Sequence, residues 1–291
     1  MKNIKDIAQL WNISERQVRY LCERGQIIGA KKEGKEWLIP HNPQRLSKKE
    51  VLTNRVYELK KHLKDCRPLT EGEKAKLNEL WSAQYTYNSN AIEGNTLTYQ
   101  ETTLVLQGIT IDKKPLKDHL EVIGHKEAFD YILSISKEKE ISSKIIKNVH
   151  SLVLAHQIQD KGVYRKIDVL IGGAVNKPTP PFLIEESIEK LIKKYKKSKK
   201  DFFEKVALFH LKFEGIHPFI DGNGRCGRLI LNLMLMQEGF LPIDIKYTDR
   251  LKYYDCFKEY FEKGNYKPMV KLIVDYETER LEGYLKSFKK Q

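Results

Sequence analysis

The segment from His217 to Arg228 is the feature that most limits what this chain can fold into. It reads His-Pro-Phe-Ile-Asp-Gly-Asn-Gly-Arg-Cys-Gly-Arg, and an apolar run that ends near Gly239 follows it. Gly222 and Gly224 predict an irregular loop whose backbone adopts positive φ and can approach a ligand closely. The apolar run predicts a buried helix, which would direct its free N–H groups and the positive end of its dipole at a bound anion.

The side chains of this segment are suited to phosphate chemistry. His217 has an ordinary pKa near neutrality, so it can take a proton from a hydroxyl nucleophile. Asp221 offers the hard oxygen ligands that Mg²⁺ prefers when it also binds substrate phosphates. Arg225 and Arg228 are three residues apart, which makes them neighbours on one helical face with planar forks for phosphate oxygens. The segment therefore predicts an anion site with a proton acceptor beside it.

These twelve residues resemble the signature of the Fic family, His-Pro-Phe-x-Asp-Gly-Asn-Gly-Arg-x-x-Arg, at every specified position. The resemblance implies a protein adenylyltransferase, which moves AMP from ATP to a Ser, Thr or Tyr hydroxyl of a target protein or of itself. It also implies a role for each residue. The base would be His217, the Mg²⁺ ligand Asp221, the α-phosphate ligands Gly222, Asn223 and Gly224, the β-phosphate ligand Arg225 and the γ-phosphate ligand Arg228.

A second segment, Ser89 to Thr96, ends a predicted helix at Gly94-Asn95. Ser89 and Glu93 are four residues apart and therefore share one helical face. Taken alone, this is the end of an amphipathic helix. It resembles the inhibitory motif of Fic proteins, which implies that Glu93 pairs with Arg228 and denies the γ-phosphate its partner. In that setting Glu93 is an inhibitor, a base that positions water to remove AMP, or both.

Two further segments carry expectations about substrate binding. The β-rich, glycine-bent run at 162–181 predicts a hairpin. In Fic proteins a hairpin here, the flap, holds the target segment as an added strand, with Ile171 and Val175 as the clamping residues. The alternative is an ordinary connector. Tyr253 and Tyr254 resemble a position near the nucleotide base, and because they are adjacent on a helix only one of them, assigned as Tyr254, faces the pocket.

The first forty-odd residues predict a different kind of structure. Two short apolar-periodic helices meet at a turn, and Ser14 with Gln17 forms a capping box at the start of the second. A run that alternates and turns at Glu33-Gly34 follows, like a basic β-wing. The segment resembles the small winged helix-turn-helix of excisionase and MerR-type regulators. Its expected DNA contacts are Arg16, Gln17, Arg19, Lys32 and Lys35. The alternative is a protein-docking or folding module with a solvated basic face.

These observations predict a mainly α protein: a Fic fold, which is a helical core with a β-hairpin flap, plus a small winged helix-turn-helix domain. The expected domains are 1–45 (winged helix-turn-helix), 46–69 (helical linker) and 70–291 (Fic domain, with the inhibitory helix near 80–94). Apolar periodicity predicts helices over 47–65, 99–107, 116–134, 142–156, 184–197, 202–213, 225–238, 251–263 and 269–286.

Charge and cysteine usage limit the partners. The formal net charge of +13 favours an anionic partner, either a nucleotide such as ATP or DNA. Part of that charge lies in a lysine-dense run at 193–200. Four widely spaced cysteines without a Cys-x-x-Cys pair exclude a disulfide framework and a zinc site. With no signal peptide and no long apolar run, the expected location is cytoplasmic, away from membranes.

Two functions remain open from sequence. The first is an adenylyltransferase that the appended module delivers to DNA or to a DNA-bound target. The second is a DNA-binding transcriptional regulator, autoregulatory or not, that keeps a nucleotide-sensing Fic core with little turnover. A homodimer is compatible with both, because DNA-binding modules of this type often read paired half-sites.

Overall fold

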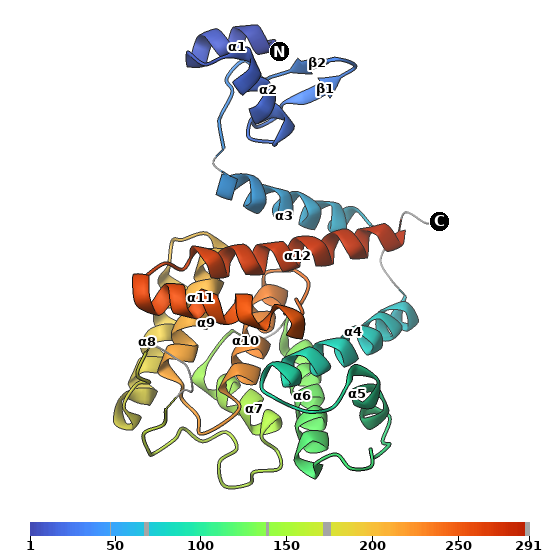
Figure 1. The fold of residues 1–291 in the computed structure, drawn as a ribbon, viewed down its shortest axis with the longest axis vertical. Helices are drawn as coiled ribbons and strands as arrows, with labels where there is room; N and C mark the ends of the chain where they lie inside the picture. Colours follow the sequence, from blue (N-terminus) through green and yellow to red (C-terminus); the bar gives the residue numbers. More distant parts are fainter. Residues whose placement is uncertain (47, 67–69, 138–139, 171–175, 289–291) are drawn as a thin grey trace. The chain divides into compact units, whose positions relative to one another are not determined.

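The computed structural model describes residues 1–46, 48–66, 70–137, 140–170 and 176–288. The chain divides into two compact units, Met1–Asp65 and Cys66–Gln291. Helix α3 (Lys48–Asp65) covers most of the expected linker and groups with the first unit. Each unit is described by itself (Figure 1).

The first unit begins with two short helices and a hairpin. Helices α1 (Ile4–Trp11) and α2 (Glu15–Glu23) meet at Asn12, which takes the left-handed conformation with φ 52°. The predicted capping box is confirmed, because the Gln17 N–H donates to Ser14 Oγ and the Ser14 N–H donates to Gln17 Oε1. Strands β1 (Lys31–Glu33) and β2 (Glu36–Leu38) pair antiparallel around the predicted turn.

One apolar core holds this unit together. Val18, Leu21 and Cys22, the predicted inner face of α2, are all buried there. Ile7 from α1 and Ile39 from the end of the hairpin have no exposed surface. Because both helices and the hairpin bury side chains in one cluster, their packing stabilises a unit too small to rely on helix propensity.

The described residues of the second unit form helices and connecting loops, with no strand. Its helices are α4 (Glu71–Ile92), α5 (Tyr99–Leu106), α6 (Leu116–Ile135), α7 (Ser143–Val153), α8 (Ile184–Lys197), α9 (Phe202–Ile216), α10 (Asn223–Gln237), α11 (Arg250–Lys263) and α12 (Lys267–Phe288). Single 3₁₀ turns at Pro181–Leu183 and Tyr247–Asp249 precede α8 and α11. The helices predicted from residue 99 onward are confirmed with ends that differ by at most three residues, whereas the helix expected near 80–94 begins earlier, at Glu71.

Helix α10 lies at the centre of this unit (Figure 1). Its residues from Asn223 to Leu235 are buried with the exception of Gly224, and it contacts α4, α6, α7 and α9. A helix that is apolar on every side is buried on every side. The central position fixes the start of α10, where the motif segment enters, deep within the helical unit.

The expected flap is only partly within the described residues. Segments 162–170 and 176–180 contain no strand. Ile171 and Val175, the expected clamping residues, lie outside the described residues, so their role stays a prediction.

Two general features bear on the expected location. All four cysteines are free. Across the described ranges, no helix combines the length and the apolar composition that crossing a bilayer requires.

Candidate functional site

His217 terminates α9 in an unusual backbone conformation. It is the C-cap residue, with φ 50° and ψ 62° in the left-handed region, which costs free energy for a residue other than glycine. The His217 N–H donates to the Phe213 carbonyl at 3.0 Å. Buried Arg165 donates from Nε to the His217 carbonyl at 2.8 Å and from Nη1 to the Ile167 carbonyl at 2.7 Å, and its Nη2 donates to the Thr179 carbonyl. These bonds hold His217 in its strained conformation.

The environment of His217 favours a neutral imidazole. Burial is the largest cause that lowers the pKa of this ring, and the positive charge of Arg165 lowers it further. The Glu214 backbone and the carboxylates of Glu93 and Asp221 oppose the shift without cancelling it. A neutral imidazole near neutral pH can accept a proton.

The loop between His217 and α10 is held by side-chain hydrogen bonds. Asn223 accepts from the Phe219 N–H and donates to the Phe219 carbonyl, each at 2.9 Å. His150 from α7 stacks on the Phe219 ring with centroids 3.6 Å apart. Because the Gly162 N–H donates to His150 Nδ1, the proton is on Nε2, which donates to the Asp221 carbonyl at 2.9 Å. The side-chain amide of Asn223 is therefore used within the loop. Its backbone N–H remains available to an anion.

The two motif glycines serve different purposes. Gly222 has φ 74°, as predicted, and a Cβ there would lie 2.7 Å from Leu154 Cδ1. Gly224 is helical, so the expected positive φ at this position is wrong. Its missing side chain instead makes room, since an added Cβ would collide with Glu93 Oε1. The glutamate carboxylate thus lies at the N-terminal turn of α10, where the helix dipole favours negative charge.

Asp221 presents an ionised carboxylate to the site. Its Oδ1 accepts from the Gly222 N–H at 2.6 Å and lies 3.3 Å from Arg225 Nη2, while Lys117 Nζ lies 4.0 Å from Oδ2. Burial acts to raise the pKa of this carboxyl, but Arg225, the Gly222 N–H and Lys117 together hold it below its usual value. The side chain is 42% exposed, so it can also contact a ligand.

Arg225 is buried and paired on two sides. Its Nη1 lies 3.0 Å from Oε1 of Glu121, a buried residue of α6, and its Nη2 faces Asp221. Reasoning from the sequence missed Glu121, because no local pattern connects α6 with the motif. Paired carboxylates hold the guanidinium in place.

Arg228 is buried and holds the end of α4. Its Nη2 lies 2.8 Å from Glu93 Oε1 and donates to the Ser89 carbonyl at 2.7 Å, while Nε donates to Ser89 Oγ at 3.1 Å. Burial acts against the charged form of this arginine, but the Glu93 carboxylate raises its pKa above its ordinary value. Helix α4 ends at Ile92 and Gly94 follows with φ 93°, as predicted. The structure therefore contains an ion pair between Glu93 and Arg228.

Comparison with known proteins agrees with this geometry. Residues 140–235 match the sequence model of the Fic/DOC family. This region is a Fic domain.

Relatives extend the likeness beyond the matched residues. The protein adenylyltransferase Fic of Drosophila ananassae is 35% identical over 206 residues, which is 69% of this chain and 41% of the relative. This chain therefore spans less than half the length of the curated relatives it matches. Fic-1 (residues 134–508) from C. elegans is 26% identical with a TM-score of 0.73, covering 83% of this chain and 73% of that chain.

A second solved structure matches over nearly its whole length. It is a Fic domain containing signaling protein from Bacteroides thetaiotaomicron, 25% identical with a TM-score of 0.72, and the match covers 84% of this chain and 99% of that chain. The fold of these neighbours and the helical architecture described above agree.

The two tyrosines of α11 differ in exposure. Tyr253 is buried, and its hydroxyl lies 2.7 Å from His210 Nε2. Tyr254 is 44% exposed, and its hydroxyl donates to the Ile92 carbonyl at the end of α4. Of the pair, Tyr254 is thus the one available to a ligand, although its contact with a nucleotide base stays a prediction.

The expected DNA contacts lie outside the Fic domain, in the first unit. Arg16, Arg19, Lys32 and Lys35 are all exposed, and Arg19 pairs with Glu15 at 3.4 Å. Gln17 is also exposed, but its Oε1 is bonded to the Ser14 backbone in the capping box. Its amide is therefore less free to meet a base edge than the sequence pattern implied.

Proposed function

We propose that this chain is a protein adenylyltransferase, which transfers AMP from ATP to a Ser, Thr or Tyr hydroxyl of a protein, including its own. The carrying observation is a half-buried imidazole with lowered pKa, His217, in the loop that also carries Asp221 and leads into the helix that bears Arg225 and Arg228. The name of the curated relatives supports the same reaction.

Each group of residues in the site has its own role in the proposed reaction. His217 accepts the proton of the attacking hydroxyl, which then forms a bond to the α-phosphorus as pyrophosphate leaves. The free N–H groups at the start of α10 and the Gly222 backbone hold the α-phosphate. Arg225 and Arg228 bind the β- and γ-phosphates and stabilise the charge that collects on the leaving group.

Asp221 fits a magnesium ion that arrives with ATP. It offers one ionised, partly exposed carboxylate, and the described residues contain no group of three or more acidic, His or Cys side chains that could hold a metal alone. Mg²⁺ commonly binds one or two carboxylates plus substrate phosphates, so this donor set suits a phosphate-bound ion. When bound, the ion neutralises phosphate charge.

We further propose that Glu93 keeps the enzyme inhibited. Its carboxylate occupies the guanidinium of Arg228 and the N-terminal turn of α10, which are the sites proposed for phosphates. ATP must displace it before it can bind productively. The same carboxylate is also placed to orient a water for removal of AMP, which would make the modification reversible.

The test uses ATP labelled at the α-phosphate, Mg²⁺ and the purified chain. Glu93→Gly should raise self-labelling about tenfold, which corresponds to about 1.4 kcal/mol, because it frees the buried Arg228 guanidinium for the γ-phosphate. Adding His217→Ala to that variant should abolish the label. Glu127→Gly, which changes an exposed glutamate on α6, is the control and should leave labelling low. Equal labelling with and without Glu93 would contradict the proposed autoinhibition. Labelling that survives His217→Ala would contradict the proposed role of His217 as the base.

DNA binding by the first unit is the second candidate. The supporting observation is the set of exposed cations on α2 and the hairpin, carried by a two-helix unit with its own core. In this function the unit delivers the enzyme to DNA, or makes the chain a regulator whose Fic core senses nucleotide. Reading paired half-sites would require a homodimer. Four free thiols support a reducing cytoplasm as the site of action.

A further inference from the structure

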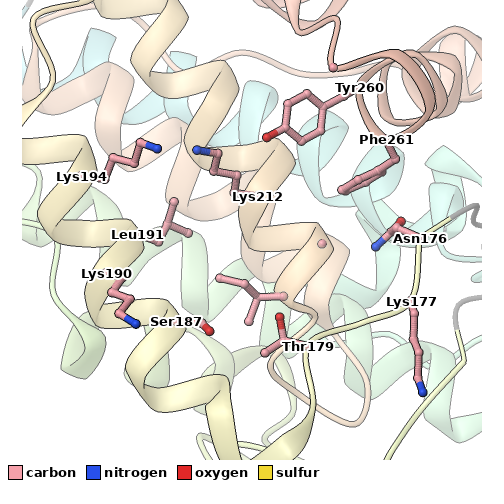
Figure 2. Close-up of a pocket in the computed structure, with 13 residues that line it drawn as sticks. Asn176, Lys177, Thr179, Ser187, Lys190, Leu191, Lys194, Lys212, Tyr260 and Phe261 are labelled. Carbon is pink, nitrogen blue, oxygen red and sulfur yellow. The ribbon is translucent and has the colours of Figure 1, made fainter.

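A basic pocket lies beside the Fic motif, on the α8, α9 and α11 side of the helical unit (Figure 2). Its volume is about 690 Å³, within the range typical of ligand sites. Lysines line it from four places: Lys177, Lys190, Lys194 and Lys212. No aspartate, glutamate or arginine is among its lining residues in the described part of the chain.

The charge in this pocket is poorly neutralised. Figure 2 shows the ammonium groups of Lys194 from α8 and Lys212 from α9 turned toward each other, with the Tyr260 hydroxyl facing the same place. Partial burial is the main cause that lowers the pKa of Lys212, and Lys194 lowers it further. Among the described residues, Lys190 pairs with Glu186 at 2.6 Å, and no ion pair involves Lys177, Lys194 or Lys212. Two like charges held together are relieved by a bound anion.

The pocket also has an apolar wall. Leu191, Ile216 and Phe261 line it beside the lysines. The Phe261 ring packs directly on Gly215, where an added Cβ would lie 2.9 Å from ring carbons. A ligand with both carboxylates and apolar groups would match this lining better than a simple inorganic anion. Ammonium groups act as point charges, while the planar arginine fork that suits phosphate is missing from the described lining.

The pocket lies next to the proposed base along the chain. Gly215 and Ile216 in its wall immediately precede His217 along the chain. Thr179, also in the wall, accepts from the same Arg165 guanidinium that donates to the His217 carbonyl. A chain that occupies the pocket would therefore reach His217 within a few residues, at about 3.3–3.6 Å per extended residue.

We propose that this pocket binds an acidic segment of the polypeptide whose hydroxyl group is modified at His217. The inference rests on the proposed transferase function for the identity of its occupant. It explains why one lysine of the dense run at 193–200, Lys194, turns into a cavity, and it makes substrate choice depend on carboxylates near the modified residue.

The test measures binding without ATP, by fluorescence anisotropy of two labelled peptides. Both contain a tyrosine; one has a tract of aspartates beside it and the other has asparagines at the same positions. The full chain carrying Glu93→Gly should bind the aspartate peptide about tenfold more tightly, and added salt should weaken the difference. Lys194→Gln with Lys212→Met, which keeps the apolar stem of Lys212, should remove the preference.

The matched control is Lys193→Gln with Lys197→Gln, which removes two charges from α8 outside the pocket lining. It should keep most of the preference. The inference would be overturned if both peptides bound equally well, or if the control variant lost the preference for the aspartate peptide to the same extent. Displacement of the aspartate peptide only by a DNA oligonucleotide would also overturn it.

Labelling separates this proposal from the function it rests on. Adding His217→Ala should leave peptide binding unchanged while it abolishes transfer to the peptide tyrosine. In the Glu93→Gly chain, the pocket variant should raise KM for the aspartate peptide about tenfold and leave KM for ATP and kcat unchanged. Preferential binding with no labelled product in any variant would refute the transferase and leave an acidic-peptide pocket. Labelled product without an acidic preference would refute the pocket alone.

Discussion

At the scale of single residues, the site depends on the motif residues and equally on residues outside the motif that hold them in position. Arg165 is the main example. It is buried and bonds the carbonyls of His217, Ile167 and Thr179, three segments that no other described side chain connects in this way. A planar guanidinium can serve several acceptors at once, whereas a lysine ammonium on a flexible stem serves them poorly.

Arg165→Lys in the Glu93→Gly chain should lower kcat for labelling by about 10- to 100-fold and leave KM for ATP unchanged, because His217 would lose its position while the phosphate ligands stay. The free energy of unfolding should fall by about 2–3 kcal/mol, measured in urea, as buried carbonyls lose their donors. Lys166→Ala, an exposed neighbour, is the control. A rise in KM for ATP with kcat intact would contradict a positioning role.

The pH dependence of labelling follows from the lowered pKa of His217. Only the neutral ring accepts a proton, so activity is present above this pKa and is lost as the pH falls through it. Since burial and Arg165 lower the pKa, the half-maximal point should lie below the ordinary value of about 6.5. The measurement is kcat of the Glu93→Gly chain against pH, with circular dichroism to verify folding. A midpoint at or above 6.5 would contradict a neutral base whose pKa is lowered by partial burial.

At the scale of elements, several hydrogen bonds hold the end of α4 against the segment 244–254. Asn88 Nδ2 donates to Asp244 at 2.7 Å, and Asn88 Oδ1 accepts from the Tyr247 N–H at 3.0 Å. Tyr254 on α11 donates to the Ile92 carbonyl at 3.0 Å. These bonds place Glu93 at Arg228. The proposed inhibition therefore depends on how the end of α4 is held in place, and not on the Glu93 carboxylate alone.

Tyr254→Phe should raise self-labelling of the otherwise unchanged chain by about two- to tenfold. The substitution removes one hydrogen bond, worth about 0.5–1.5 kcal/mol, that holds the end of α4, while the ring stays available for a nucleotide base. Labelling with α-labelled ATP is the readout. Tyr131→Phe, which removes a hydroxyl bonded to Asn148, is the matched control and should have no effect. Reduced labelling would show that the hydroxyl itself serves the reaction.

At the scale of the whole molecule, the two units have separate cores and separate proposed functions. The residues proposed to bind phosphates are all in the second unit, and the residues proposed to contact DNA are all in the first. Such a division allows one function to be changed without the other, because distant, independent sites respond additively to substitution.

Arg16→Ala with Arg19→Ala should weaken binding to duplex DNA and reduce the slope of log affinity against log salt by about two, since each lost cation releases one fewer counterion. Fluorescence anisotropy at several salt concentrations measures it, and labelling activity should not change. Lys161→Ala with Lys166→Ala removes the same charge from the second unit and should leave the slope intact. If the unaltered chain shows no salt-sensitive affinity for duplexes, the first unit is a docking module.

The sequence by itself determined the helices, the capping box at Ser14, the turn of Gly222 and the chemistry of the motif, because each depends on residues close together in the chain. Only the tertiary structure decided which distant groups meet. Arg228 and Ser89 are 139 residues apart, and Arg165 and His217 are 52 apart. Glu121 and the lysine pocket likewise depend on how helices pack, and periodicity within one helix carries no information about the neighbour it will face.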